Sequence, residues 1–251
     1  MRKILSIAWM VLGLFAQAQE DAEKLFSEAN TFYKEANYTR AVGVYLSIEE
    51  QGFVNADLFF NTGNCYYKMN QVAPAIYYYE KALKVDPGHE DARFNLEFAQ
   101  RMTIDVIETL PETFGQKFAR KIIQPLSYET WGLIAVVFSW LMALFFWRYY
   151  FSGRSRIKLL FFNLSLGCLL GMALSLGFAY SNQRTVELER PAIVFAKKAV
   201  VSNAPSLGGE LVFELHEGTK VQVLDALDDW KKIRIADGQT GWISSTSIKE
   251  I

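Results

Sequence analysis

Residues 63–87 read GNCYYKMNQVAPAIYYYEKALKVDP, and an earlier part of the chain carries the same pattern at a constant offset. The matched pairs are Ala22 and Ala56, Leu25 and Phe59, Ala29 and Gly63, Phe32 and Tyr66, Ala41 and Ala75, and Tyr45 and Tyr79. Small residues at fixed positions let two helices approach closely, while aromatic residues interlock between them. Pro87 cannot continue a helix and ends the second copy. The period predicts two helix–turn–helix repeats, over 22–55 and 56–89.

These residues and their period resemble the tetratricopeptide repeat, which implies stacked helix pairs with a concave face that binds protein segments. The pattern restarts at Glu90 as Asp91-Ala92-Arg93-Phe94-Asn95-Leu96-Glu97-Phe98-Ala99, without a complete partner helix. A lone helix of this kind covers the exposed end of a repeat stack. We therefore expect a repeat region over 21–103, with a capping helix over 90–103.

The N-terminus has the features of a signal peptide. Met1-Arg2-Lys3 is basic, the uncharged apolar run Ile4–Phe15 follows, and Ala16-Gln17-Ala18 has the small residues of a cleavage site. The apolar run is short for a bilayer span. We expect a signal peptide over 1–18, with an uncleaved anchor as the alternative.

Two later segments are long enough and apolar enough to cross a membrane. Neither Thr130–Trp147 nor Leu159–Gln183 contains a charged residue. Tryptophan and tyrosine residues lie near the ends of these segments, as is common at membrane interfaces. The expected transmembrane helices are 130–150 and 159–181. A buried helix of a soluble domain is the alternative for the first.

The expected loop between the spans, 151–158, is basic: it contains Arg154, Arg156 and Lys158 and no acid. The positive-inside tendency places such a loop in the cytoplasm and both flanking domains in the periplasm of a bacterial inner membrane. The linker over 104–128 carries Lys117, Arg120 and Lys121 within an amphipathic stretch, Phe114–Ile123. This stretch either lies on lipid headgroups or is a plain connecting helix.

Small residues recur along one face of each expected span. They are Gly167, Gly171, Ser175 and Ala179 in the second span and Ala135, Ser139 and Ala143 in the first. Such faces permit close helix contacts in membranes. They serve either to pack the two spans on each other or to recruit another membrane protein.

The C-terminal part, 191–251, has the pattern of a small β-barrel. Short β-branched runs are separated by polar turns, and apolar residues alternate with polar ones. The expected strands are 199–201, 210–215, 220–224, 230–235 and 240–243, with tight turns at Glu217-Gly218 and Asp237-Gly238. The sequences LHEGTKV (215–221), WKKI (230–233) and DGQTGWI (237–243) resemble bacterial SH3-like domains. The loop Ser202-Asn203-Ala204-Pro205-Ser206 departs from that family's Arg-Ser-Gly-Pro-Ser.

The expected fold class is a multi-domain chain of all-α tetratricopeptide repeats, two transmembrane α-helices and a C-terminal SH3-like small β-barrel. In this order, the segments resemble the BatE-type proteins of Bacteroides aerotolerance operons. The resemblance implies a component of a cell-envelope complex that acts beside von Willebrand A-type and repeat proteins of the same operon. It also implies a role in envelope stress.

Little in the sequence points to catalysis. The formal net charge is −1, which gives no summed field toward nucleic acid. His89 is expected to start a helix and His216 to lie at a strand end, while Cys65 and Cys168 are expected to be apolar core residues without a disulfide. Phosphate-loop, nucleophile-elbow and zinc-site patterns are absent from the sequence. We predict a protein that is not an enzyme, with no cofactor and no metal site.

The sequence supports a binding function better than a catalytic one. The repeat register predicts groove-facing residues for a protein partner: Asn30, Tyr33, Lys34, Phe60, Asn61, Asn64, Tyr67, Lys68, Phe94, Asn95, Phe98 and Arg101. Asparagine amides can bond a peptide backbone, and aromatic rings supply apolar area. Solvation of the groove, or packing of the linker into it, is the alternative. In the SH3-like part, Trp230 and Trp242 are either ligand contacts or barrel core.

Repeat domains that clamp a terminal carboxylate carry Lys and Arg in this groove, whereas the corresponding positions here are Phe26, Asp91 and Asn95. An internal or apolar segment is therefore the expected ligand. Two functions remain: a membrane-anchored scaffold acting through its repeats, or an envelope sensor whose SH3-like part binds peptidoglycan or peptide.

Overall fold

The computed structural model describes residues 19–251, except residues 109 and 112 and the side chains of 186–188. The predicted signal peptide, residues 1–18, lies outside the described residues. The chain divides into two compact units. One joins the N-terminal part, through residue 109, to Pro191–Ile251, and the other is Leu110–Arg190.

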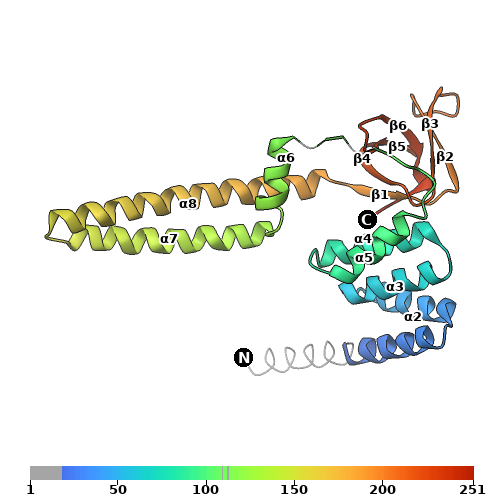
Figure 1. The fold of residues 1–251 in the computed structure, drawn as a ribbon, viewed down its shortest axis with the longest axis horizontal. Coiled ribbons are helices and arrows are strands. Elements are labelled where there is room, and N and C mark those ends of the chain that lie inside the picture. The colour runs from blue at the N-terminus through green and yellow to red at the C-terminus, as the bar shows by residue number, and fades with distance from the viewer. Residues whose placement is uncertain (1–18, 109, 112) are drawn as a thin grey trace, which may run out of the picture. The chain divides into compact units, whose positions relative to one another are not determined.

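The first unit begins with paired helices in the predicted repeat. A helix over residues 19–34 is followed by α2 (Tyr38–Glu50), α3 (Ala56–Lys68), α4 (Val72–Val85) and α5 (Glu90–Gln100) (Figure 1). The turns within the two pairs are alike, because Ala36 and Asn70 both adopt φ of 58°. Asn55 caps α3 by accepting hydrogen bonds from the amides of Asp57 (2.7 Å) and Leu58 (3.2 Å).

Small residues lie where the helices cross, as the period predicts. Ala41 and Ala75 are fully buried. A Cβ atom at Gly63 would lie 2.8 Å from the ring of Tyr79, so the close approach of α3 to α4 requires glycine there. The repeated sequence pattern thus reflects packing constraints that recur once per helix pair.

The C-terminal part of the same unit, predicted as a small β-barrel, is one antiparallel sheet. Its strands are β1 (Pro191–Val194), β2 (Lys198–Ser202), β3 (Leu211–His216), β4 (Lys220–Leu227), β5 (Trp230–Arg234), β6 (Thr240–Ser244) and β7 (Ile248–Glu250). The strand order is β3-β2-β6-β5-β4-β1-β7. The predicted small barrel is not closed, because β3 and β7 are edges that do not pair with each other. Register shifts between Val201 and Ser202 and between Val223 and Asp225 bend the sheet without closing it.

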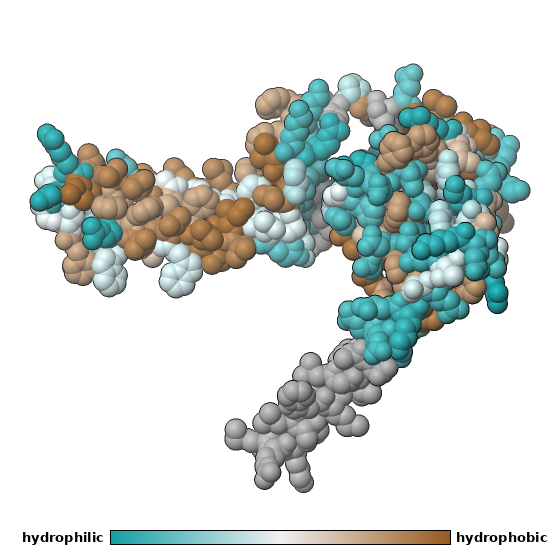
Figure 2. All heavy atoms as spheres, turned by 60° about the horizontal axis from the view of Figure 1, so that its bottom comes forward, coloured by the Kyte–Doolittle hydropathy of each residue, from teal (hydrophilic) through white to brown (hydrophobic). Residues whose placement is uncertain are grey.

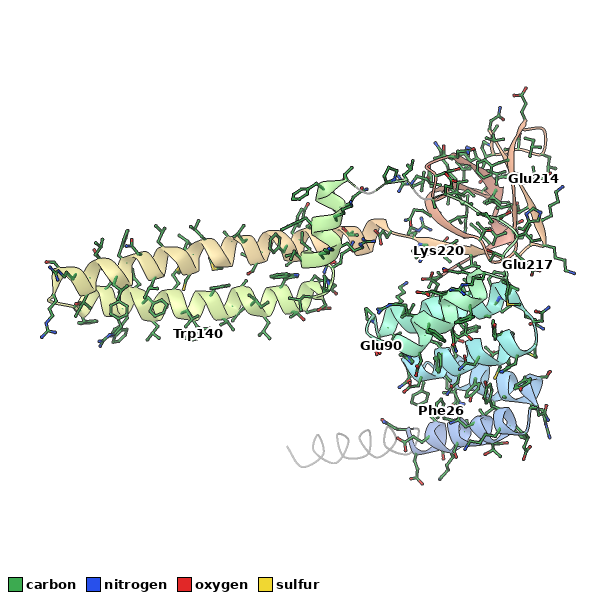
Figure 3. All side chains as sticks on the ribbon, in the orientation of Figure 1. Phe26, Glu90, Trp140, Glu214, Glu217 and Lys220 are labelled. Atoms are coloured by element: carbon green, nitrogen blue, oxygen red, sulfur yellow. The ribbon has the colours of Figure 1, made fainter. Side chains whose placement is uncertain are left out.

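The sheet packs on the repeats, an arrangement that the sequence did not predict. Ile193 of β1 is fully buried in the same apolar core as the repeat helices. The ring of Phe195 lies 5.7 Å from that of Tyr77 on α4. Lys220, labelled in Figure 3, forms a 2.8 Å ion pair with Glu80 of α4. Repeats and sheet therefore form one folded body, although the whole second unit lies between them in the sequence.

Asp105, just beyond the capping helix, joins this body through the turn between β3 and β4. Its carboxylate accepts hydrogen bonds from the Thr219 hydroxyl at 2.6 Å and the His216 amide at 2.7 Å, and it contacts His216 Nδ1 at 2.7 Å. Burial opposes ionisation of Asp105, but these bonds outweigh it and hold its pKa below the usual value of 3.8. Gly218, with φ of 90°, fits the turn closely against Thr103 and α4.

The second unit contains two long apolar helices, α7 (Tyr128–Phe151) and α8 (Ser155–Leu188), each long and apolar enough to cross a membrane. Figure 2 shows the hydrophobic surface along both helices and hydrophilic side chains at the turn that joins them. The turn is shorter than the predicted loop 151–158: only 152–154 are non-helical, and Arg156 and Lys158 lie in the first turn of α8. Lysine and arginine favour helix, so α8 extends beyond the apolar run.

Three of the seven small residues predicted on the spans, Ala135, Gly171 and Ser175, pack between α7 and α8, whereas Ser139, Ala143 and Gly167 are exposed. Ala135 and Ser175 are buried, and a Cβ atom at Gly171 would lie 2.9 Å from the ring of Phe138. These contacts support the packing role among the two alternatives. In Figure 3, Trp140 lies on the side of α7 away from α8.

Replacing Gly171 by leucine is expected to weaken this helix pair by about 1–3 kcal/mol, the usual cost of overpacking. The matched control is Gly167→Leu on the same helix, because a Cβ atom at Gly167 meets nothing within 4 Å. Thermal unfolding in lipid nanodiscs should show a lower melting temperature for Gly171→Leu alone. Equal melting temperatures for the two variants would contradict the assigned contact.

Candidate functional groove

The first helices of the successive pairs, the helix over 19–34, α3 and α5, supply a hollow on the repeat surface. Its volume is about 310 Å³. The side chains that line it are Tyr33, Asn64, Tyr67, Lys68, Phe94, Asn95 and Phe98. All seven are among the groove residues predicted from the repeat register. We call these seven residues the repeat groove.

A hydrogen-bonded trio beside the groove involves Asn30. Its Oδ1 accepts from the Tyr45 hydroxyl at 2.6 Å and from Asn61 Nδ2 at 3.3 Å. The same trio recurs at the corresponding positions of the next repeat: Asn64 Oδ1 accepts from the Tyr79 hydroxyl at 2.8 Å and from Asn95 Nδ2 at 2.8 Å.

These trios give the asparagines a role that the sequence did not predict. Both lone pairs of the Asn30 and Asn64 carbonyl oxygens are used inside the protein. The amides therefore orient the groove wall and satisfy the hydroxyls of two buried tyrosines. Only the remaining amide groups are left to contact a ligand.

Aromatic side chains supply the apolar surface of the groove. Phe94 is 60% exposed and Phe98 is 38% exposed, and their rings lie 4.8 Å apart on α5. The guanidinium of Arg101 lies 5.0 Å from the Phe98 ring. Exposed aromatic pairs with a nearby cation are typical anchors at protein interfaces.

Five predicted residues lie outside the lining of the hollow: Asn30 and Asn61 of the trio described above, and Phe60, Lys34 and Arg101. Phe60 packs against Tyr79 and His89, with ring centroids 6.1 and 4.8 Å apart, and therefore belongs mainly to the helix packing. Lys34 is exposed at the end of its helix. Arg101 follows α5 and reaches the groove only through Phe98.

The positions that would hold cations in a carboxylate clamp are occupied differently. Phe26, labelled in Figure 3, packs on Tyr45 with ring centroids 5.7 Å apart. Asn95 is hydrogen-bonded to Asn64. Asp91 is an exposed acid in the first turn of α5. This arrangement does not favour a terminal carboxylate as the ligand.

Trp230 and Trp242 lie on neighbouring strands, on the sheet face opposite its core. Trp242 pairs with Lys232, and Trp230 lies two residues before Lys232 on the same face of β5. Both tryptophans are half-buried, whereas the core of the sheet includes Ile233 and Ile243. The sequence left open whether these rings are core or contacts, and their place outside the core is compatible with contacts.

The remaining reactive residues have structural positions. His89 caps α5, because its Nδ1 accepts from the Ala92 amide at 3.2 Å. His216 is hydrogen-bonded to Asp105. Both cysteines are free and buried, and burial raises the pKa of the Cys65 thiol to about 12. Among the residues that the structure describes, no group of three or more His, Cys, Asp or Glu side chains is placed to hold a metal ion.

The stacked helix pairs and the bent antiparallel sheet are those of two interaction modules. Residues 56–89 match the family model of the tetratricopeptide repeat, and residues 203–249 match that of the bacterial SH3 domain. The chain therefore contains both domains.

A similar solved structure is the crystal structure of the Sgt2 TPR domain from Aspergillus fumigatus. It is 14% identical, with a TM-score of 0.31, and the match covers 66% of this chain and 82% of that one. None of the curated proteins matches the chain significantly.

Proposed function

We propose that the chain is a non-enzymatic, membrane-anchored scaffold of a bacterial cell-envelope complex and that its repeat groove binds a protein partner. The hollow lined by Tyr33, Tyr67 and Phe98, among others, carries this proposal. It combines exposed aromatic rings with hydrogen-bonding amides, which is the chemistry of peptide recognition. Its lining is built on helices, so the groove is formed before a ligand arrives.

The ligand that best fits the groove is an internal, apolar segment of a protein. Phe94 and Phe98 offer an apolar face, and the clamp positions lack cations. Lys68 at the rim can bind a carboxylate of the ligand without selecting a chain end. By resemblance, von Willebrand A-type and repeat proteins of the same operon are the proposed partners, with a role in aerotolerance or envelope stress.

The two apolar helices support a membrane anchor in this proposal. The basic turn between them is assigned to the cytoplasm, and the repeats and the SH3 domain to the periplasm. Anchoring raises the effective concentration of the groove near other membrane proteins, so a short groove can suffice. Reporter fusions at residue 153 and at the C-terminus test this topology, and an exported reporter at 153 would overturn it.

To test this function, the tagged chain is purified from solubilised membranes and the envelope proteins that copurify with it are identified. Loss of specific proteins on substitution of groove residues supports a scaffold that acts through its repeats. Deletion of the repeats is not a clean test, because Ile193 is buried in the repeat core and Asp105 holds the β3–β4 turn. Point substitutions keep the folded body intact.

A second candidate function is an envelope sensor whose SH3 domain binds peptidoglycan or peptide. The observation that favours it is the position of Trp230 and Trp242 outside the sheet core. Aromatic faces beside polar groups are suited to sugar or peptide ligands.

If the chain is a sensor, Trp230→Ala with Trp242→Ala is expected to reduce its retention on purified cell wall by at least about tenfold, since aromatic anchors are worth about 1.4 kcal/mol or more. Val85→Ala is the control, because Val85 is an exposed apolar residue of the repeats and not of the sheet. Wild-type protein that is not retained on cell wall would exclude peptidoglycan as the ligand.

A further inference from the structure

The segment before the first apolar helix forms a short cationic helix. It consists of α6 (Phe114–Phe118) and the π-helical turn η1 (Ala119–Ile123). Residues 113–127 contain Lys117, Arg120 and Lys121 and no carboxylate. Lys117 and Lys121 are both exposed and are spaced i, i+4, so they lie on one side of the helix.

The same segment exposes large apolar side chains. Phe114 is 86% exposed, Ile122 47% and Phe118 43%. Thr113 and Gln116 form a capping box that fixes the start of the helix. A short helix with cations and bulky apolar groups is suited to a lipid–water boundary rather than to bulk water.

This helix is fixed to the ends of the two apolar helices. Trp131 Nε1 of α7 donates to the Ile123 carbonyl at 3.0 Å, and Asn182 Nδ2 of α8 donates to the Leu126 carbonyl at 2.6 Å. The Phe178 ring lies 6.3 Å from Phe118. Figure 1 shows α6 running across the α7–α8 pair rather than along it. If α7 and α8 span a bilayer, α6 then lies along its surface.

We propose that α6 and η1 form a binding surface for anionic phospholipid headgroups. Lys117 and Lys121 contact the phosphates, while Phe114 and Ile122 enter the boundary of the acyl chains. The inference rests on the proposed membrane anchoring. It also assigns a use to cations that the positive-inside tendency does not place on this side of the membrane.

The test uses the full chain in nanodiscs of phosphatidylcholine with increasing phosphatidylglycerol. An environment-sensitive dye on Phe114→Cys reports the depth of α6 through quenching by spin-labelled lipid. Cys65 and Cys168 are buried. Wild-type protein treated with the same dye checks that these two cysteines do not react. Quenching at 114 is expected to saturate at a low mole fraction of phosphatidylglycerol. Lys117→Gln with Lys121→Gln should need roughly 25-fold more, since each of the two lysines near an anionic surface contributes about fivefold.

Two controls separate the possible failures. Lys197→Gln with Lys198→Gln removes the same charge from the other unit and should leave the titration unchanged. A second dye, on Leu144→Cys of α7, reports whether the span is inserted. No quenching at 144 would contradict membrane anchoring itself. Quenching at 144 without quenching at 114, or quenching at 114 that is independent of phosphatidylglycerol, would overturn the headgroup site.

Discussion

Replacing Phe94 and Phe98 together by alanine is expected to lower recovery of the groove-bound partner by at least about 30-fold. Aromatic anchors at the centre of an interface cost about 2 kcal/mol or more when truncated, and about 2 kcal/mol corresponds to about 30-fold in affinity. Both rings line the hollow. The measurement is quantitative mass spectrometry of proteins purified with the tagged chain from solubilised membranes.

The folded state should be nearly unaffected by this change, because both rings are exposed and surface substitutions usually alter stability by less than about 0.5 kcal/mol. Val85→Ala is the matched control, since Val85 is 43% exposed at the end of α4, away from the groove. Unchanged recovery with the double variant would show that the hollow is not the binding site.

Replacing Asp105 by asparagine is expected to destabilise the body formed by the repeats and the SH3 domain by about 2–4 kcal/mol at neutral pH, because hydrogen bonds to a charged group contribute about 1.5–3 kcal/mol each. The carboxylate accepts such bonds from Thr219 and from His216. Asparagine also presents an N–H group toward donors. Thermal unfolding should show a melting temperature lower by about 5–10 °C.

The pH dependence gives this prediction a second readout. The pKa of Asp105 is depressed in the folded protein, so its stabilisation is fully present above the unfolded value of about 3.9. It is lost as the pH falls through the lower folded value. The stability difference between wild type and Asp105→Asn should therefore shrink below about pH 3.9. Asp91→Asn, at an exposed acid, is the control. A difference that stays constant as the pH falls well below the unfolded value would contradict the assigned bonds.

Local patterns explain why so much of the helical part was predictable. The repeat period encodes contacts within one pair and its neighbour, such as Gly63 on Tyr79. The residues that line the groove were predictable from the same repeat register, because they occupy the positions that helix packing leaves free. The turns at Gly218 and Gly238 were predicted for a similar reason: their φ angles of 90° and 93° define a conformation that favours glycine.

Contacts between distant parts of the chain were not predictable in this way. Asp105 and His216 are 111 residues apart, and the motif LHEGTKV (215–221), which contains His216, does not indicate a partner outside its own domain. Strands β1 and β7 were missed because they are only four and three residues long. The asparagine trios were visible as repeated residues, but the sequence did not distinguish an amide that contacts a ligand from one that bonds a neighbouring tyrosine.

The joined body changes how the scaffold is expected to work. The repeats and the SH3 domain share a core at Ile193, so the proposed groove partner and a ligand on the sheet would be held on one folded body. Independent movement of the two domains is not expected, because Asp105 and Lys220 also bridge them. A partner bound by both surfaces would gain from this fixed spacing.

The most direct test of the central claim is photo-crosslinking in intact membranes from a reactive residue placed at Tyr67, with identification of the attached peptide. Crosslinks are predicted to internal apolar segments of envelope proteins, to be lost in Phe94→Ala with Phe98→Ala, and to be absent when the reactive residue is placed at Val85. Crosslinks from Trp230 or Trp242 but none from Tyr67 would contradict the account and assign partner binding to the SH3 domain.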